Sequence, residues 1–212
     1  MTARPRLRGL LHQYAFFASM PALPVLLLVS PTGRAAFAGT VYGLSLVALF
    51  GVSALFHRVT WSEGARRWMG RLDHAMINVA IAGSFTPFGM LVLSGPVATV
   101  CMILVWGGTL GGVLLHLLWI DAPKSLSAFV YLVVGWSGVA AFPQLVSHLG
   151  WRPTALLALG GALYSAGAAV YALRRPNLAP GVFGYHEMFH ALVIAAAVTH
   201  YAVVALYVLP CA

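Results

Sequence analysis

The sequence predicts an all-α membrane protein that folds as a seven-transmembrane-helix bundle. First, 61% of the 212 residues are hydrophobic and only 8% are charged, which leaves too few charges to cover a soluble surface. Second, apolar runs of about 20 residues, the length that crosses a bilayer as a helix, recur along the chain. Third, Pro, Gly and charged residues separate these runs, and no long loop remains that could form a soluble domain.

Seven apolar runs make up one expected transmembrane domain, residues 1–212. In chain order they are separated by SPTGR, RVTWSEGARRWMGR, SGP, DAPK, HLGWRP and RRPNLAPG. The first run could be a signal peptide because RPRLR precedes it, but no small-residue cleavage site ends it. Pro87 is expected to kink the third helix. The expected spans are residues 14–30, 36–57, 73–94, 97–119, 125–147, 153–173 and 186–208.

Basic side chains predict the orientation, because Lys and Arg are concentrated in the cytoplasmic loops of membrane proteins. With the N-terminus in the cytoplasm and the C-terminus outside, only Arg34 and Arg152 of the 12 basic residues lie outside. Topology rather than nucleic-acid binding therefore accounts for the net charge of +8, and anionic lipid headgroups are the expected partners. The residues expected inside are Arg4, Arg6, Arg8, Arg58, Arg66, Arg67, Arg71, Lys124, Arg174 and Arg175.

Four ionisable side chains are predicted to meet near the cytoplasmic face. In this topology the second span ends at His57, the third starts at Asp73, and the last starts with His186 and His190. Three segments far apart in sequence thus place polar groups at one depth of the membrane. Because ionisable residues are costly inside membrane spans and usually mark function, this convergence indicates a site.

The residue types in this group favour a metal ion. His186 and His190 are four residues apart, so they share one face of a helix and can bind one ion together. His57 can supply a third imidazole, which leaves a fourth tetrahedral position for water, as in catalytic zinc sites. Asp73, and Ser53 on the same helix face as His57, would then orient a ligand or the bound water.

Structural explanations remain open for the same residues. The three histidines could instead hydrogen-bond to one another between helices, as polar side chains do in membrane interfaces. Asp73 could be an acid at a helix N-terminus, where the helix dipole favours it, close to Arg71. Ser53 could simply be a small residue packed between helices.

The stretch YHEMFHALV contains the H-E-x-x-H pattern with which soluble metalloproteases hold zinc. Both common extensions of that pattern lack their third ligand, because Ala196 stands where the third histidine would be and no acidic residue follows Glu187. Glu187 is turned about 100° from His186 along the helix. It could be a base, a partner of a metal ligand or a solvated residue at the headgroup level.

The remaining histidines receive weaker interpretations. His116 approaches the depth of the site and could contact a substrate or a metal ligand. His74 is expected to be an interfacial side chain, and His12 and His148 are expected in the interface or in loops. His200 lies about 21 Å along its helix from the first histidine of the H-E-x-x-H pattern, so it is expected near the outer side and away from the metal.

Two stretches resemble the signatures of the progestin and adipoQ receptor superfamily, especially its bacterial haemolysin III-like branch. They are SALFHRVTWSEGARRWMGRLDHAMINVAIAGSFTPF, residues 53–88, and YHEMFHALVIAAAVTH, residues 185–200, and the resemblance covers essentially the whole chain. It implies seven helices in the orientation given above and a bacterial inner membrane. It also implies zinc held by His57, His186 and His190, with Ser53 and Asp73 near the zinc-bound water.

The leading functional hypothesis is zinc-dependent hydrolysis of a lipid amide or ester, with a ceramide-like lipid as the expected substrate. Adiponectin receptors of the superfamily resemble zinc-dependent ceramide hydrolases, and the resemblance extends this activity to the chain as an expectation. Asp73 and Ser53 are the catalytic candidates, and zinc would activate the attacking water. The alternatives are a non-enzymatic membrane lipid sensor with structural zinc, or a cytolysin of the haemolysin type.

Overall fold

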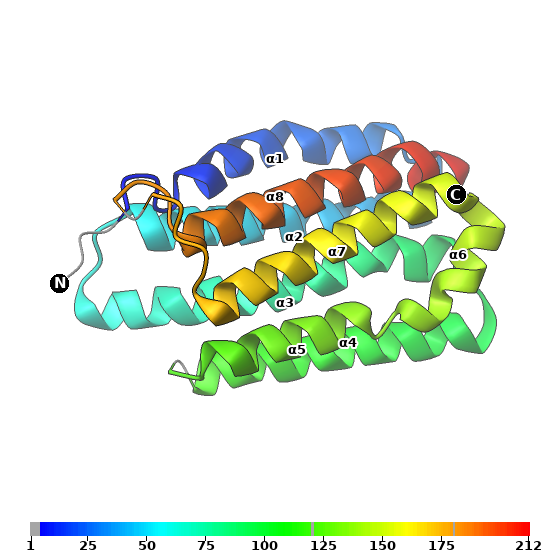
Figure 1. The fold of residues 1–212 in the computed structure, drawn as a ribbon. Coiled ribbons are helices and arrows are strands. Elements are labelled where there is room, and N and C mark those ends of the chain that lie inside the picture. The colour runs from blue at the N-terminus through cyan, green and yellow to red at the C-terminus, as the bar shows by residue number, and fades with distance from the viewer. Residues whose placement is uncertain (1–4, 120, 180) are drawn as a thin grey trace.

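A computed structural model describes residues 5–119, 121–179 and 181–212. Arg4, one of the residues expected on the cytoplasmic side, lies outside the described residues. Within the described residues the chain is helical, without strands apart from one isolated bridge between Ala179 and Phe183. The helices run alongside one another in a bundle, and the described chain starts at one end of the bundle and finishes at the other (Figure 1).

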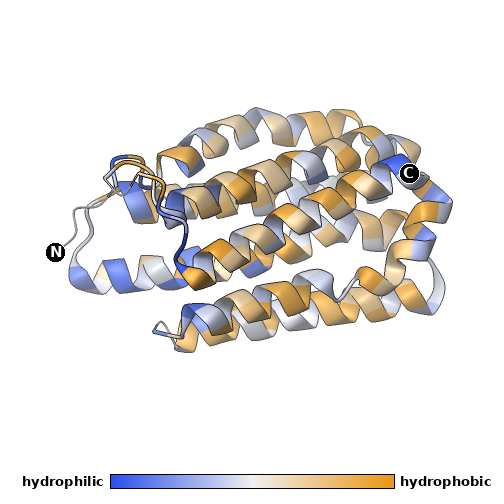
Figure 2. Cartoon of the chain, viewed as in Figure 1, coloured by the Kyte–Doolittle hydropathy of each residue, from blue (hydrophilic) through white to orange (hydrophobic). Residues whose placement is uncertain are grey.

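The helices follow the apolar runs of the sequence. In Figure 2, hydrophobic residues dominate the helices, and hydrophilic residues gather where α3 begins and where the chain leads into α8. The α-helices are α1 (Leu10–Leu28), α2 (Gly33–Arg58), α3 (Glu63–Leu91), α4 (Gly95–Leu118), α5 (Lys124–Trp136), α6 (Phe142–Leu149), α7 (Trp151–Leu173) and α8 (Tyr185–Val203). The short 3₁₀ helix η1 (Val139–Ala141) joins α5 to α6, and α8 continues as a π-helical turn η2 (Val204–Val208) and a 3₁₀ turn η3 (Leu209–Cys211).

Six helical units of the described chain are long and apolar enough to cross a membrane. They are α1, α2, α4, the α5–α6 unit, α7 and α8 with its extension to Cys211. This finding fits the predicted all-helical, multi-pass membrane protein. Helix α3, which corresponds to the third predicted span, is not among the six. It carries a charged N-terminal part and the polar residues Asp73, His74 and Asn78 within its buried part.

The start of α3 corrects the prediction that residues 58–71 form a loop. The helix begins at Glu63, ten residues before the expected start, because Ser62 caps it by accepting a hydrogen bond from the Ala65 N–H. Hydropathy marks where the apolar run begins. The helix begins earlier than that, with a polar N-terminal extension that carries arginines on its surface. Asp73 therefore lies almost three turns inside α3, so it is not an acid at a helix N-terminus.

The expected helix over residues 125–147 is interrupted. Helix α5 ends at Trp136, and α6 starts at Phe142 after η1. Gly138 lies in this break against the ring of Phe85, where an added Cβ would be 2.5 Å from Cε2. Pro143 stands in the first turn of α6, where its missing N–H is tolerated. The apolar pattern is continuous here, so the period of hydrophobic residues does not reveal the break.

Helix α3 packs between α2 and α4, while α1 packs against α2 and α7 against α8 (Figure 1). A small residue lets α2 and α3 approach closely. A Cβ added to Gly83 of α3 would lie 2.2 Å from Oγ and 2.4 Å from Cβ of Ser45 on α2. Small residues commonly permit such backbone approach in membrane bundles. This contact places the helix that carries Asp73 beside the helix that carries His57.

The Gly83→Ala variant tests the importance of this approach. The added methyl group overlaps Ser45, so we expect α2 and α3 to separate and the free energy of unfolding to fall by about 1–3 kcal/mol. Thermal unfolding of the detergent-purified protein measures the effect. Gly107→Ala in α4 is the matched control, because an added Cβ there meets nothing within 4 Å. Equal melting temperatures for the two variants would contradict a tight α2–α3 contact.

Candidate metal centre

Side chains from three helices meet at the end of the bundle where α2 finishes and α8 begins. One ring nitrogen from each of His57, His186 and His190 lies within 4.8 Å of the others, so the three residues could hold a metal ion. The Nε2 atoms of His57 and His186 are 3.1 Å apart. The Asp73 Oδ2 atom is 3.6 Å from the Nε2 atom of His57. The structure thus brings together the four ionisable residues that the topology placed at one depth.

The donor set fits a divalent ion with a preference for nitrogen. Two nitrogens that each bind a tetrahedral zinc ion at about 2.1 Å are roughly 3.4 Å apart, close to the 3.1 Å between the Nε2 atoms of His57 and His186. A hydrogen bond between the imidazoles of His57 and His186 would also fit their separation. Such a bond joins one N–H to one lone pair, however, and does not involve His190. A cation accepts a lone pair from all three rings. His186 and His190 are buried and His57 is partly buried, which suits a shielded site.

Ser53 and Asp73 lie beside the three histidines. Both are buried, and the Ser53 hydroxyl interacts with the Asp73 carboxyl group. They line the same cavity as His190. A carboxylate at this position can accept a proton from a water molecule in the cavity, and the hydroxyl can hold the carboxylate in place.

The cavity has a volume of about 160 Å³ and is lined mostly by apolar side chains. At one end lie Ser53, Asp73 and His190, and it follows α8 as far as His200. Ten residues along a helix correspond to about 15 Å, so the cavity is elongated along the bundle. Its walls between these ends are largely apolar and include Ile77, Phe85, Phe88, Leu132, Leu157, Phe189 and Val193.

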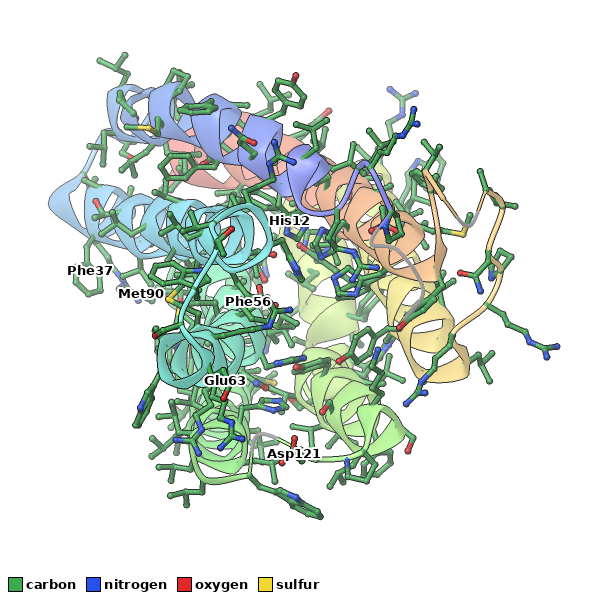
Figure 3. The ribbon with its side chains drawn as sticks, turned by 90° about the vertical axis from the view of Figure 1, so that its left-hand side faces the viewer. His12, Phe37, Phe56, Glu63, Met90 and Asp121 are labelled. Atoms are coloured by element: carbon green, nitrogen blue, oxygen red, sulfur yellow. The ribbon has the colours of Figure 1, made fainter. Side chains whose placement is uncertain are left out.

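His12 belongs to the interior, so its expected place in the interface or a loop was wrong. Its side chain is only 2% exposed, and its ring lies flat on that of His190, with centroids 3.7 Å apart and planes 3° apart. Figure 3 looks along the bundle and shows His12 on the side of α1 that faces the other helices. The first predicted span began at residue 14, whereas α1 begins at Leu10. That boundary error placed His12 outside the membrane span.

Glu187 connects α8 to the N-terminal segment of the chain. It is 1% exposed, and its Oε1 atom accepts a hydrogen bond from Arg8 Nε at 2.5 Å. Its Oε2 atom accepts a hydrogen bond from the Gly184 N–H at 2.8 Å and so caps the start of α8. The interpretation of Glu187 as a solvated residue was therefore wrong. The carboxylate anchors the helix that carries two of the histidines.

Backbone hydrogen bonds strengthen the same connection. The N–H groups of Arg6 and Leu7 donate to the carbonyl oxygens of Gly181 and Val182, at 3.1 and 3.3 Å. The segment that precedes α1 therefore lies along the loop that precedes α8. This arrangement joins the two segments at the end of the bundle that holds the histidine cluster.

His74 and His116 form a polar network outside the histidine cluster. His74 shares hydrogen bonds with the Gly70 carbonyl at 2.7 Å and the Tyr171 hydroxyl at 2.9 Å, so it is not a solvated interfacial residue. His116 is buried and bonded to the Tyr131 hydroxyl at 3.0 Å. Tyr131 lines the cavity, whereas His116 is absent from its lining. A direct substrate contact by His116 is therefore not supported.

Two further histidines lie away from the histidine cluster. His148 is exposed on α6. His200 shares a hydrogen bond with the Leu157 carbonyl at 3.1 Å, at the far end of the cavity from the cluster. It does not join the three histidines that could hold a metal.

Comparison with known proteins shows similarity along most of the chain. Residues 2–201 match the family described as Haemolysin-III related. "Hemolysin-3 homolog" of Bacillus subtilis (strain 168) is 31% identical over 186 residues, which cover 86% of this chain and 84% of that protein. "Hemolysin-3" of Bacillus cereus is 29% identical over 204 residues, 95% of this chain and 90% of that protein. The "Adiponectin receptor protein" of Drosophila melanogaster is 33% identical over 182 residues, covering 74% of this chain and 39% of that protein.

Glu187→Gln and Arg8→Gln test whether the ion pair is a structural anchor. Each variant loses the same charged contact, so we expect each to melt roughly 2–6 °C lower while the metal content stays unchanged. The double variant should melt no lower than either single variant, because only one interaction is lost. Thermal unfolding and elemental analysis in detergent measure both quantities. Loss of metal from Glu187→Gln would contradict this role and return Glu187 to the metal site.

Proposed function

Because the chain belongs to the haemolysin III-related family of membrane proteins, we propose that it binds one zinc ion and hydrolyses an amide or ester bond of a membrane lipid. The observation that carries this proposal is the position of the histidine cluster. Of the three convergent imidazoles, that of His190 lines an elongated, mostly apolar cavity, and so does Asp73, which lies 3.6 Å from His57. An acyl chain fits the apolar walls, and a carbonyl group at its end would meet the polar residues.

We propose that α3 also crosses the membrane, which raises the number of membrane helices from six to seven. We further propose that the histidine cluster faces the cytoplasm. The basic residues support this orientation. Arg58 ends α2 and Arg66 and Arg67 begin α3 at the end of the bundle that holds the cluster, whereas Arg34 and Arg152 begin α2 and α7 at the other end. The bacterial relatives favour the plasma membrane of a bacterial cell, which is the inner membrane where a cell has two, as the location.

His57, His186 and His190 would hold the zinc ion, which supplies a Lewis acid for the carbonyl oxygen and lowers the pKa of a bound water. The Oδ2 atom of Asp73 accepts the proton of the attacking water and passes it to the leaving group. Ser53 keeps the carboxyl group of Asp73 oriented toward the cavity. The surrounding helices exclude bulk water, so electrostatic interactions within the site are strong.

The cavity favours an amphiphilic substrate such as a ceramide-like lipid amide. The cavity is about 160 Å³, and its apolar lining comes mostly from α3, α5, α7 and α8. A small polar substrate would gain little from such walls, whereas a lipid chain buries apolar surface there. Ser53, Asp73 and His190 stand where the scissile bond of such a chain would lie.

The zinc content of the purified protein tests the metal site. Wild-type protein, prepared in detergent without chelators, should contain about one zinc per chain by elemental mass spectrometry. The His57→Ala, His186→Ala, His190→Ala variant should contain none, because all three nitrogen ligands are gone. His148→Ala, at an exposed position, controls for general loss of imidazole. Wild-type protein without zinc would overturn the proposed site. It would also overturn the proposed hydrolysis, which needs zinc as the Lewis acid.

The Asp73→Asn variant tests the proposed reaction. We expect it to retain zinc, because Asp73 is not one of the three nitrogen donors, and to hydrolyse a fluorescent ceramide analogue at least 100-fold more slowly. Asp121→Asn is the control because Asp121 is exposed. Undiminished turnover in Asp73→Asn would remove this residue from the mechanism. Wild-type protein that holds zinc but turns over neither lipid amides nor lipid esters would favour a lipid sensor with structural zinc.

A further inference from the structure

The first turn of α1 touches two of the three histidines, although it supplies no member of the group that could hold a metal. The ring of His12 covers one face of the His190 ring, as described above. Gly9, the N-cap of α1, lies against His57 so closely that an added Cβ would be 2.4 Å from the Cβ of His57. Gly9 also has a φ angle of 77°, a left-handed conformation that glycine adopts without strain. Residues 9–12 thus contact His57 of α2 and His190 of α8.

The contacts of His12 are made by its ring rather than by its nitrogens. Both ring nitrogens are buried and neither makes a well-formed hydrogen bond, although a backbone group of His190 lies within reach of the ring. One ring face stacks on His190, and the Phe50 ring meets the imidazole edge-on at 5.2 Å. Burying two nitrogens without well-formed hydrogen bonds is costly, so the ring stack must offset that cost.

The stack also separates His12 from an ion held by His190. A metal ion lies in the plane of the imidazole that binds it, at about 2.1 Å from the nitrogen. Because the two rings are parallel and their centroids are 3.7 Å apart, the rings lie in separate layers, and the nitrogens of His12 do not point toward those of His190. His12 is therefore not a further ligand of the same ion. Its effect on the metal passes through His190.

We propose that the first turn of α1 is a positioning element for the metal ligands, with His12 fixing the ring plane of His190 and Gly9 fixing the place of His57. A flat ring against His190 restricts rotation of that side chain and keeps one nitrogen aimed at His57 and His186. The close approach of Gly9 prevents His57 from moving toward α1. This inference rests on the proposed zinc site and adds α1 to the helices that build it.

The zinc dissociation constant, measured by competition with a chromogenic chelator, tests the proposal. We expect His12→Ala to raise it about tenfold, as is usual when a residue supporting a metal ligand is removed. His12→Phe should restore the wild-type value because it keeps a flat ring, whereas His12→Gln should not, because it keeps only hydrogen-bonding groups. Gly9→Ala should weaken zinc binding to a similar extent. Tyr14→Ala is the control, since Tyr14 is on the same helix but 65% exposed.

Cobalt substitution gives a second measurement that a general loss of stability would not reproduce. The visible absorption of Co²⁺ in the His12→Ala variant should differ from wild type, and His12→Phe should recover the wild-type spectrum. Wild-type zinc affinity in both His12→Ala and Gly9→Ala, or failure of a folded His12→Phe variant to recover affinity, would overturn the positioning role. Absence of zinc from wild-type protein would instead overturn the proposed function itself.

Discussion

Burial of imidazole rings among apolar helices is the constraint on which the arrangement of this bundle depends. A polar group without a partner in such surroundings destabilises a fold by roughly 1–3 kcal/mol. His57, His186 and His190 therefore need either one another or a cation, and their ring nitrogens lie within 4.8 Å. This requirement ties the end of α2 to the start of α8. Asp73, 3.6 Å from His57, adds α3 to the same constraint.

The segment before α1 and the loop before α8 support this cluster at the end of the bundle. Glu187 lies between the two histidines of α8 in sequence, but its carboxylate is occupied by Arg8 and by the Gly184 N–H. The segment before α1 and the loop before α8 are joined by backbone hydrogen bonds. Arg8, Glu187 and the Gly184 N–H are consequently paired within the protein at this end, while the interior beyond His190 is lined mostly by apolar side chains. The polar and apolar parts of the site meet at Ser53 and Asp73.

The proximity of residues far apart in sequence could be predicted where the direction of each membrane crossing alone determines it. The alternation of membrane crossings put His57, Asp73 and the α8 histidines at one depth, and the structure has them in contact. Exact helix ends could not be predicted, because hydropathy follows the apolar run while Ser62 starts α3 earlier. The same error hid His12, whose position before the first apolar run looked interfacial. A break after Trp136 was also invisible, since the residues around Gly138 remain apolar.

The partners of individual side chains were the least predictable feature. The pattern H-E-x-x-H contains no information about Arg8, which is 179 residues away in sequence from Glu187. His74 and Asp73 are neighbours in sequence, yet their side chains leave α3 in different directions, one toward Tyr171 and the other toward His57. Such pairings depend on how helices rotate against one another, and a single sequence does not specify that rotation.

The separation of these partners along the chain has a consequence for biosynthesis. His57 and His186 are 129 residues apart. At about 5–20 residues per second, a ribosome needs roughly 6–26 s to add the second after the first. During that interval α2 has been made before α8, and the segment around Arg8 has no Glu187 to pair with. Completion of the three-histidine cluster and pairing of the N-terminal segment with the loop before α8 are therefore among the last events of assembly, after the final helix has been made.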